Sequence, residues 1–122
     1  MIPESSVQVS RDRAGETAAE WWLERDDHGV TARGARGAVA RAEVQEQDPG
    51  VLLVFWVEER LPAELRTRLT RTAFEHPALR PRRPVSVAFP NRESDVLTEV
   101  RRHVTGSPHV AGATCLLEGL VR

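Results

Sequence analysis

Few residues in this chain have the types and the spacing that chemistry requires. Asp26-Asp27-His28 offers carboxylate and imidazole groups, which serve in metal sites and in general acid and base catalysis. Gly29 follows directly, and this combination is more typical of a tight turn, so we interpret the stretch as the turn of a hairpin. Cys115 lies in an apolar stretch with no base beside it, which predicts a small core residue and not a nucleophile.

Arginine supplies the remaining charge chemistry. All 17 basic residues are Arg, and both Lys and Tyr are absent, a residue choice typical of a bacterial genome of high GC content. No amine or phenol side chain is therefore present to act as acid, base or Schiff-base nucleophile. Arg80, Arg82 and Arg83 alternate with prolines that hold the chain extended, so they could contact phosphates or an acidic partner. A solvated connector is the alternative for this segment.

Composition limits the class of protein further. The 17 basic residues nearly balance 18 acidic ones, so no overall field attracts nucleic acid or an anionic membrane. The four histidines have no metal-ligand spacing, and a single cysteine excludes an intramolecular disulfide. Because no hydrophobic leader follows Met1, we expect a cytoplasmic protein. Because the histidines lack metal-ligand spacing, we expect no bound metal.

The elements that must position these residues are organised around one apolar run, residues 51–57, between Asp48-Pro49-Gly50 and a charged stretch. It is too short to span a bilayer, which takes about 20 residues. A run this rich in Val and aromatic residues predicts a central strand buried on both faces. Burial on both faces predicts that Trp56→Ala lowers the free energy of unfolding by about 3 to 5 kcal/mol.

The residues before this strand alternate in the manner of an antiparallel meander. Residues 7–10 predict an edge strand, and residues 20–25 and 30–33 predict a hairpin. For residues 38–47 a helix is possible because Ala is a good helix former, but we prefer a strand that the following turn joins to the apolar run.

After the apolar run the period becomes helical. Residues 61–74 carry Leu at one helical face, and residues 85–89 alternate as a strand. Asn91 is expected to cap a second helix that ends before Gly106, and residues 111–121 predict a final strand. The prediction is a single α+β domain over residues 1–122, with a mixed, mainly antiparallel sheet: an N-terminal meander, then strand, helix, strand, helix, strand.

Tryptophan gives the main indication of a binding surface. Trp21 and Trp22 point to opposite faces of a strand, so one belongs to the core and the other to a surface or an interface. Trp22 and Trp56 could also flank a small-molecule pocket. We expect a protein partner or a homo-oligomer, and neither a membrane nor nucleic acid.

The order of these elements resembles the core of the GNAT acyltransferase superfamily. The resemblance covers the last two-thirds of the chain and depends on residues 51–57 as the strand that lies against acyl-CoA, residues 61–74 as the next helix, and residues 85–91 as the strand that ends in Asn91. It implies acyl-CoA as cofactor and N-acyl transfer as activity. The family places a glycine-containing loop at the helix N-terminus, where free amides bind the CoA pyrophosphate.

The corresponding stretch, Arg60-Leu61-Pro62-Ala63-Glu64-Leu65, departs from that pattern. It has no glycine, Pro62 has no amide hydrogen, and Glu58 adds negative charge beside it. The tyrosine that the family often uses as a general acid is also missing. We therefore expect a non-catalytic, GNAT-like binding or interaction module that needs no cofactor. The alternative is an acyl-CoA-dependent N-acyltransferase with an altered CoA loop. The candidate ligand or interface residues are Trp22, Trp56, Glu58, Asn91, Arg80, Arg82 and Arg83.

Overall fold

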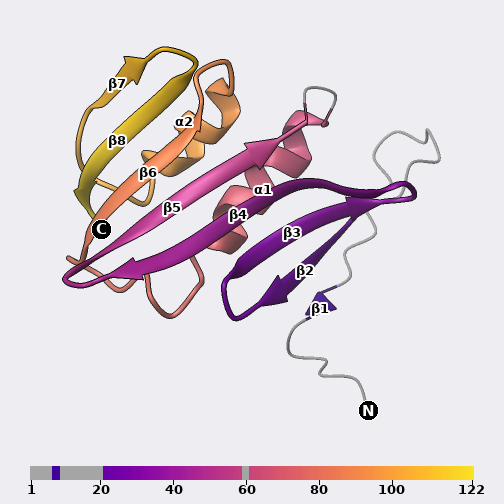
Figure 1. Ribbon diagram of the computed structural model, residues 1–122, viewed down its shortest axis with the longest axis horizontal. Helices are drawn as coiled ribbons and strands as arrows, with labels where there is room; N and C mark the ends of the chain where they lie inside the picture. The colour runs from indigo at the N-terminus through magenta and orange to yellow at the C-terminus, as the bar shows by residue number, and fades with distance from the viewer. Residues whose placement is uncertain (1–6, 9–20, 59–60) are drawn as a thin grey trace.

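The computed structural model describes residues 7–8, 21–58 and 61–122. Its strands form one sheet in the order β1-β2-β3-β4-β5-β6-β8-β7 (Figure 1). The elements in chain order are β1 (Val7–Gln8), β2 (Trp22–Asp26), β3 (Gly29–Gly34), β4 (Gly37–Gln47), β5 (Gly50–Val57), α1 (Ala63–Ala73), β6 (Pro84–Pro90), α2 (Ser94–Val100), β7 (Pro108–Ala111) and β8 (Thr114–Leu120).

Strands β1 to β5 form the expected antiparallel meander. Residues 37–47 are a strand, which confirms that interpretation over a helix. A bulge shifts the register between β3 and β4, because Ala32 pairs with Ala40 while Arg33 pairs with Ala38. At this bulge Val39 is buried and Ala38 is exposed.

Strand β6 pairs in parallel with β5, and helix α1 makes the connection between them. Leu65, Leu69 and Ala73 recur at helical spacing on one face of α1 and are buried, as their spacing predicts. Pro62 is the N-cap residue and Phe74 the C-cap residue, so the helix ends before His76 as expected. Neither α1 nor α2 has the length or the apolar composition needed to cross a bilayer.

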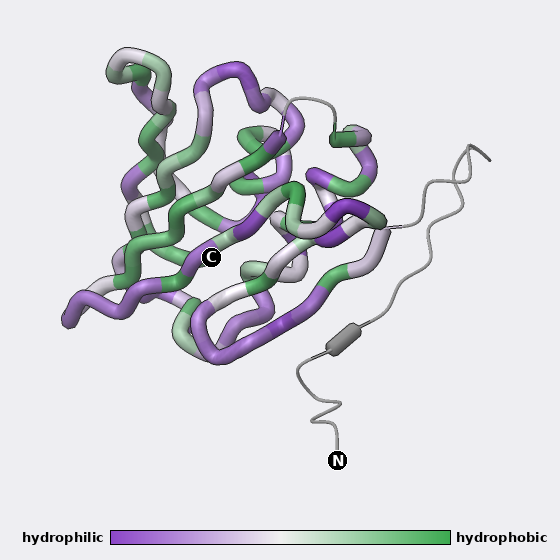
Figure 2. Tube along the Cα trace, turned by 45° about the vertical axis from the view of Figure 1, so that its right-hand side comes forward, coloured by the Kyte–Doolittle hydropathy of each residue, from purple (hydrophilic) through white to green (hydrophobic). Residues whose placement is uncertain are grey.

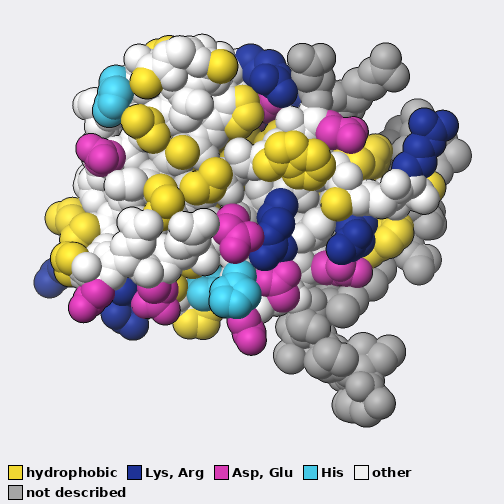
Figure 3. All heavy atoms as spheres, in the orientation of Figure 1, with side chains coloured by type: hydrophobic (Ala, Val, Ile, Leu, Met, Phe, Trp, Pro, Cys, Tyr) yellow, Lys and Arg dark blue, Asp and Glu magenta, His cyan; other side chains and the backbone are white. Residues whose placement is uncertain are grey.

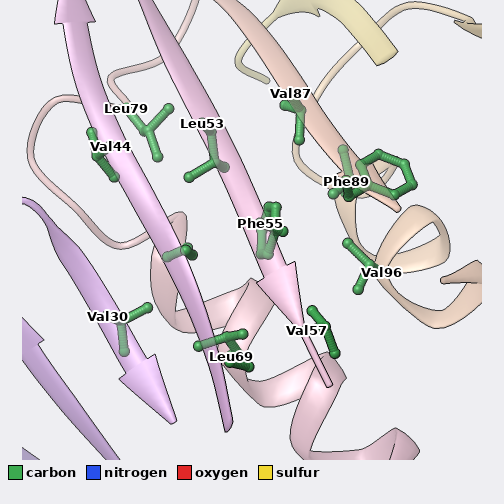
Figure 4. Close-up of a cluster of buried hydrophobic side chains, with 14 of the residues drawn as sticks. Val30, Val44, Leu53, Phe55, Val57, Leu69, Leu79, Val87, Phe89 and Val96 are labelled. Atoms are coloured by element: carbon green, nitrogen blue, oxygen red, sulfur yellow. The ribbon is translucent and has the colours of Figure 1, made fainter. Parts of the chain in front are cut away.

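The core lies between the sheet and the two helices, which pack against each other on one face. Leu53 and Phe55 of β5, Leu69 of α1 and Val96 of α2 all point into this layer (Figure 4). Figure 2 shows hydrophobic stretches along the middle of the sheet and hydrophilic residues at its connections. The fold thus has two layers, a mixed sheet and a pair of helices.

The expectation that β5 is buried on both faces is wrong. Leu53, Phe55 and Val57 are buried against the helices, whereas Leu52 and Val54 on the other face are half-buried. Trp56 on this second face is 51% exposed. Both described helices pack on the same side of the sheet, so the apolar run reflects one buried face and one apolar face toward solvent.

The C-terminal region differs from its prediction in three ways. Residues 111–121 are not one strand, because a turn at Gly112, with φ of 65°, separates β7 from β8, and β8 lies between β6 and β7. Helix α2 ends at Val100, so Val104, whose spacing from Val100 predicts that it continues the helix, pairs with Val121 in an isolated bridge. Asn91 is not the cap of α2; its side-chain amide donates a hydrogen bond to the carbonyl of Gly112 at 2.9 Å.

Candidate ligand-binding site

The parallel ladder between β5 and β6 ends before either strand does. Its pairs run from Val51 with Val85 to Val54 with Ala88. Strand β5 continues to Val57 and β6 to Pro90. Within the described part of the chain, the register therefore gives the last three residues of β5 no partner in β6. We name this region the β5–β6 gap.

Pro90 accounts for the end of the ladder. The Glu58 amide donates to the Val39 carbonyl of β4 at 2.9 Å, so by alternation Phe55 and Val57 direct their backbone groups toward β6. In the register of this ladder, the next donor in β6, opposite the Phe55 carbonyl, is the nitrogen of residue 90. Proline has no amide hydrogen, so the ladder cannot continue.

The gap consequently contains one backbone acceptor, the Phe55 carbonyl, whose ladder donor is missing. The Val57 amide lies two residues further along the same edge of β5, opposite the Pro90 carbonyl in this register. The Val57 carbonyl faces the same way and accepts a hydrogen bond from Nη2 of Arg92 at 3.4 Å. In a parallel ladder, a carbonyl and an amide two residues apart on one strand bond the amide and the carbonyl of a single residue on the neighbouring strand.

Side chains close the gap on the helix side. Phe89 of β6 is 2% exposed, and Val96 of α2 is fully buried. Together with Phe55 and Val57 they pack beside the end of the ladder (Figure 4). On the opposite face of the sheet, Trp56 is exposed.

That opposite face is apolar at its centre. Figure 3, in the orientation of Figure 1 with the helices behind the sheet, shows hydrophobic side chains gathered across it. By cross-strand pairing, Leu52 and Val54 lie beside Ser86 and Ala88, and Ala88 lies beside Leu116. An apolar face next to a backbone carbonyl without its ladder donor is a surface suited to binding.

The meander side of the same face is polar and ordered by Arg41, the cross-strand neighbour of Trp56. Arg41 donates hydrogen bonds to Asp26 at 2.9 and 3.1 Å, to Glu43 at 2.7 Å and to Thr31 at 2.6 Å. The hydrogen bond from Arg41 holds the pKa of Asp26 below its usual range, against the opposing effect of burial. This network fixes the edge of the apolar surface.

The predicted site residues lie in three separate places. Trp56, Glu58 and Asn91 lie at the carboxyl ends of β5 and β6, beside the gap. Trp22 is half-buried on β2, three strands from β5, so the structure does not bring it beside Trp56.

Arg80, Arg82 and Arg83 lie at the opposite end of the parallel strands, before β6. Arg83 is structural: Nε donates to the Pro49 carbonyl at 3.0 Å, and Nη1 bonds Glu46 at 2.9 Å. Arg80 and Arg82 are exposed.

Sequence reasoning missed the residues that form the gap, Phe55, Val57, Pro90 and Arg92. Pro90 was visible as a strand terminator, but its effect depends on the register with β5, which the sequence does not state. The motif Asp26-Asp27-His28 forms the expected turn, in which the His28 amide donates to Oδ1 of Asp26 at 2.7 Å.

A pocket of about 350 Å³ lies between that turn and the C-terminal end of α1. Arg25 and Glu75 line this pocket and form an ion pair with each other. His76 Nδ1 accepts a hydrogen bond from the Ala78 amide at 3.0 Å, so Nε2 carries the proton that bonds the Asp27 carbonyl at 2.8 Å. The ring therefore ties the hairpin to the helix and is not arranged as a general base.

Two buried carboxylates join α1 to α2. Glu93 pairs with Arg66 at 2.8 Å, and Glu99 pairs with Arg71 at 3.2 Å and His103 at 2.9 Å. Burial opposes ionisation of Glu99, but the hydrogen bonds from Arg71 and His103 outweigh it and hold the pKa of that carboxyl below its usual range. These pairs fix the helix interface.

Cys115 is buried in β8, as predicted, and burial raises the pKa of its thiol. A raised pKa keeps the thiol protonated and therefore unreactive.

Comparisons with known proteins identify no family. No protein-family model matches the chain, and no curated protein matches it significantly. Among solved structures, a protein of Sphaerobacter thermophilus described as a proposed acetyltransferase aligns with a TM-score of 0.49 and 13% identity, over 99% of this chain and 80% of that one. This likeness is too slight to assign an activity.

Proposed function

We propose that this chain is a non-catalytic binding domain that takes an extended segment of a protein partner into the β5–β6 gap. The observation that carries the proposal is the end of the parallel ladder at Val54 and Ala88, with Pro90 in the next donor position. An added strand supplies the amide that Pro90 lacks. Its N–H donates to the Phe55 carbonyl and its C=O accepts from the Val57 amide.

The surroundings of the gap favour a protein ligand. Trp56 gives an exposed aromatic surface beside the β5–β6 gap, and tryptophan is enriched at the centre of protein interfaces. Leu52 and Val54 extend that apolar surface along β5. Backbone pairing would provide affinity, and the side chains on this face would select the sequence of the segment.

The second candidate is an acyl-CoA-dependent N-acyltransferase, because acyl-CoA also carries secondary amides that fit the same backbone pair. The start of α1 argues against it. Pro62 is the N-cap residue, Glu64 lies in the first turn, and the first turn contains no glycine. Glu58, at the end of β5, is exposed and would repel the pyrophosphate. The binding domain is therefore preferred.

Pro90→Val tests the proposal directly. Valine restores the amide hydrogen, so the ladder should extend by one pair and close the gap. Peptides are first selected from a random displayed library on the wild-type protein. They should bind this variant at least about tenfold more weakly, because β6 then occupies the backbone groups of β5 that the peptides would bond. In NMR spectra of the wild type, the Val57 amide should shift when a selected peptide is added.

Pro84→Val is the matched control, since Pro84 is exposed at the other end of β6. This variant should retain peptide affinity. Selected peptides that bind the wild type and Pro90→Val equally would contradict the proposal. Titration with acetyl-CoA and CoA separates the two functions, because micromolar binding that Pro90→Val abolishes would favour the acyltransferase.

A further inference from the structure

Four exposed arginines from three separate segments gather around the last residues of the chain. They are Arg82, Arg101, Arg102 and Arg122, here named the arginine cluster. Within the described residues none of the four has a carboxylate partner, unlike Arg83 or Arg71 nearby. We propose that the arginine cluster binds an acidic segment of a partner protein, at a surface separate from the β5–β6 gap.

Backbone hydrogen bonds bring the three segments together. The Arg82 amide donates to the Val121 carbonyl at 2.6 Å, and the Val121 amide donates to the Arg83 carbonyl at 3.0 Å. On the other side, the Arg122 amide donates to the His103 carbonyl at 2.8 Å. Neighbouring extended segments lie about 4.8 Å apart, so Arg82 and His103 are separated by roughly 10 Å across the chain end.

The end of α2 completes the cluster. Arg101 is the C-cap residue, and its carbonyl accepts a hydrogen bond from Nε of Arg122 at 3.2 Å. Arg102 follows directly and is exposed. Glu99 of α2 is buried and bonds Arg71 and His103 instead of a member of the cluster.

Arg82 has a backbone conformation that is uncommon for its residue type. Its φ is 69°, and among the described residues it is the one non-glycine with positive φ. Glycine adopts this region without steric cost, whereas Arg does not. An arginine at this position therefore has a steric cost that glycine would not have.

The charge distribution favours an acidic protein segment over nucleic acid. The chain has a net charge of −1, so carboxylates elsewhere on the surface would repel a polyanion longer than the cluster. Nucleic acid carries a phosphate about every 3.4 Å along each strand and extends well beyond roughly 10 Å. Single-strand binding also uses exposed aromatic rings, but His103 stacks on Phe74, with ring centroids 4.5 Å apart.

The test compares two variants with the wild type, using a fluorescently labelled peptide of alternating Glu and Gly as the probe. The first variant combines Arg82→Gly, Arg101→Gln and Arg102→Gln. It should bind the probe about tenfold more weakly at low salt and show a smaller loss of affinity as salt is raised. The second, Arg36→Gln, removes an exposed arginine in the turn between β3 and β4, and should bind as the wild type does.

The unfolding temperature shows whether a loss of binding comes from misfolding. Arg82→Gly relieves the left-handed backbone, so it should unfold at an equal or higher temperature than the wild type. Equal losses in the two variants, or no wild-type binding of the probe at low salt, would overturn the proposal. An oligothymidine of equal charge is the second probe. Binding of the oligonucleotide without binding of the peptide would show that the arginine cluster binds nucleic acid and not an acidic protein segment.

Discussion

Val54 of β5 and Ala88 of β6 form the last pair of the parallel ladder, and the next donor position in β6 is Pro90. One residue without an amide hydrogen thus decides where the parallel ladder ends. The β5–β6 gap lies between two strands of the core, so its helix side is packed, while Trp56 on the other side is exposed.

Hydrogen exchange should detect the gap in the free protein. The amides of Leu53 and Val57 both point toward β6, but Leu53 lies within the paired ladder and Val57 lies beyond it. We expect the Val57 amide to exchange roughly a hundredfold faster, because it lies beyond the last pair of the ladder, where a local opening of the strand ends is enough to expose it. Equal protection of the two amides would show that β5 and β6 remain paired to their ends.

Adjacent aromatic residues of β5 should differ sharply in their effect on stability. Phe55 is 4% exposed within the core, so Phe55→Ala should lower the free energy of unfolding by about 3 to 5 kcal/mol. Trp56 is 51% exposed, so Trp56→Ala should cost at most about 1 kcal/mol, well below the cost expected for a strand buried on both faces. Urea denaturation of both variants measures the difference, and similar losses would contradict the one-sided burial of β5.

The buried carboxylate of Glu99 should make stability depend on pH. Its pKa in the folded protein is below the ordinary value of 4.5, so its contribution is present above that value and is lost as pH falls through the folded pKa. Glu99→Gln should lower the free energy of unfolding by about 1 to 3 kcal/mol at neutral pH. Repeated at about pH 3, the measurement should give a smaller difference from the wild type. A difference that stays constant with pH would show that Glu99 contributes by packing alone.

Two glycines near the C-terminus should respond differently to a methyl group. A Cβ at Gly119 would collide with the backbone carbonyl of Thr105, which neither segment can avoid without moving. Gly119→Ala should therefore lower the free energy of unfolding by about 3 kcal/mol. A Cβ at Gly112 would meet no atom within 4 Å. Gly112→Ala should therefore lower the free energy of unfolding by only about 1 kcal/mol, because alanine must adopt the left-handed φ of 65°. Thermal unfolding compares them, and equal costs would argue against the close approach of residues 105 and 119.

Local pattern determined most of the elements. Alternation with the turn at residues 26–29 predicts the β2–β3 hairpin, and leucines at helical spacing predict α1. These signals depend on neighbours within a few residues, so they are readable without the fold. The α+β class and the parallel pairing of β5 with β6 across a helix follow from the order of those elements.

Tertiary structure decided what covers each face and where strands part. The sequence of β5 is apolar throughout, and only the packing of both helices on one side leaves Trp56 exposed. Strand β8 enters the sheet between β6 and β7, a choice between distant segments that no local period encodes. Pro90 was visible as a strand end, yet it opens a gap only because the register with β5 places it opposite the Phe55 carbonyl. Contacts between residues far apart in the chain set that register, and local sequence patterns do not report them.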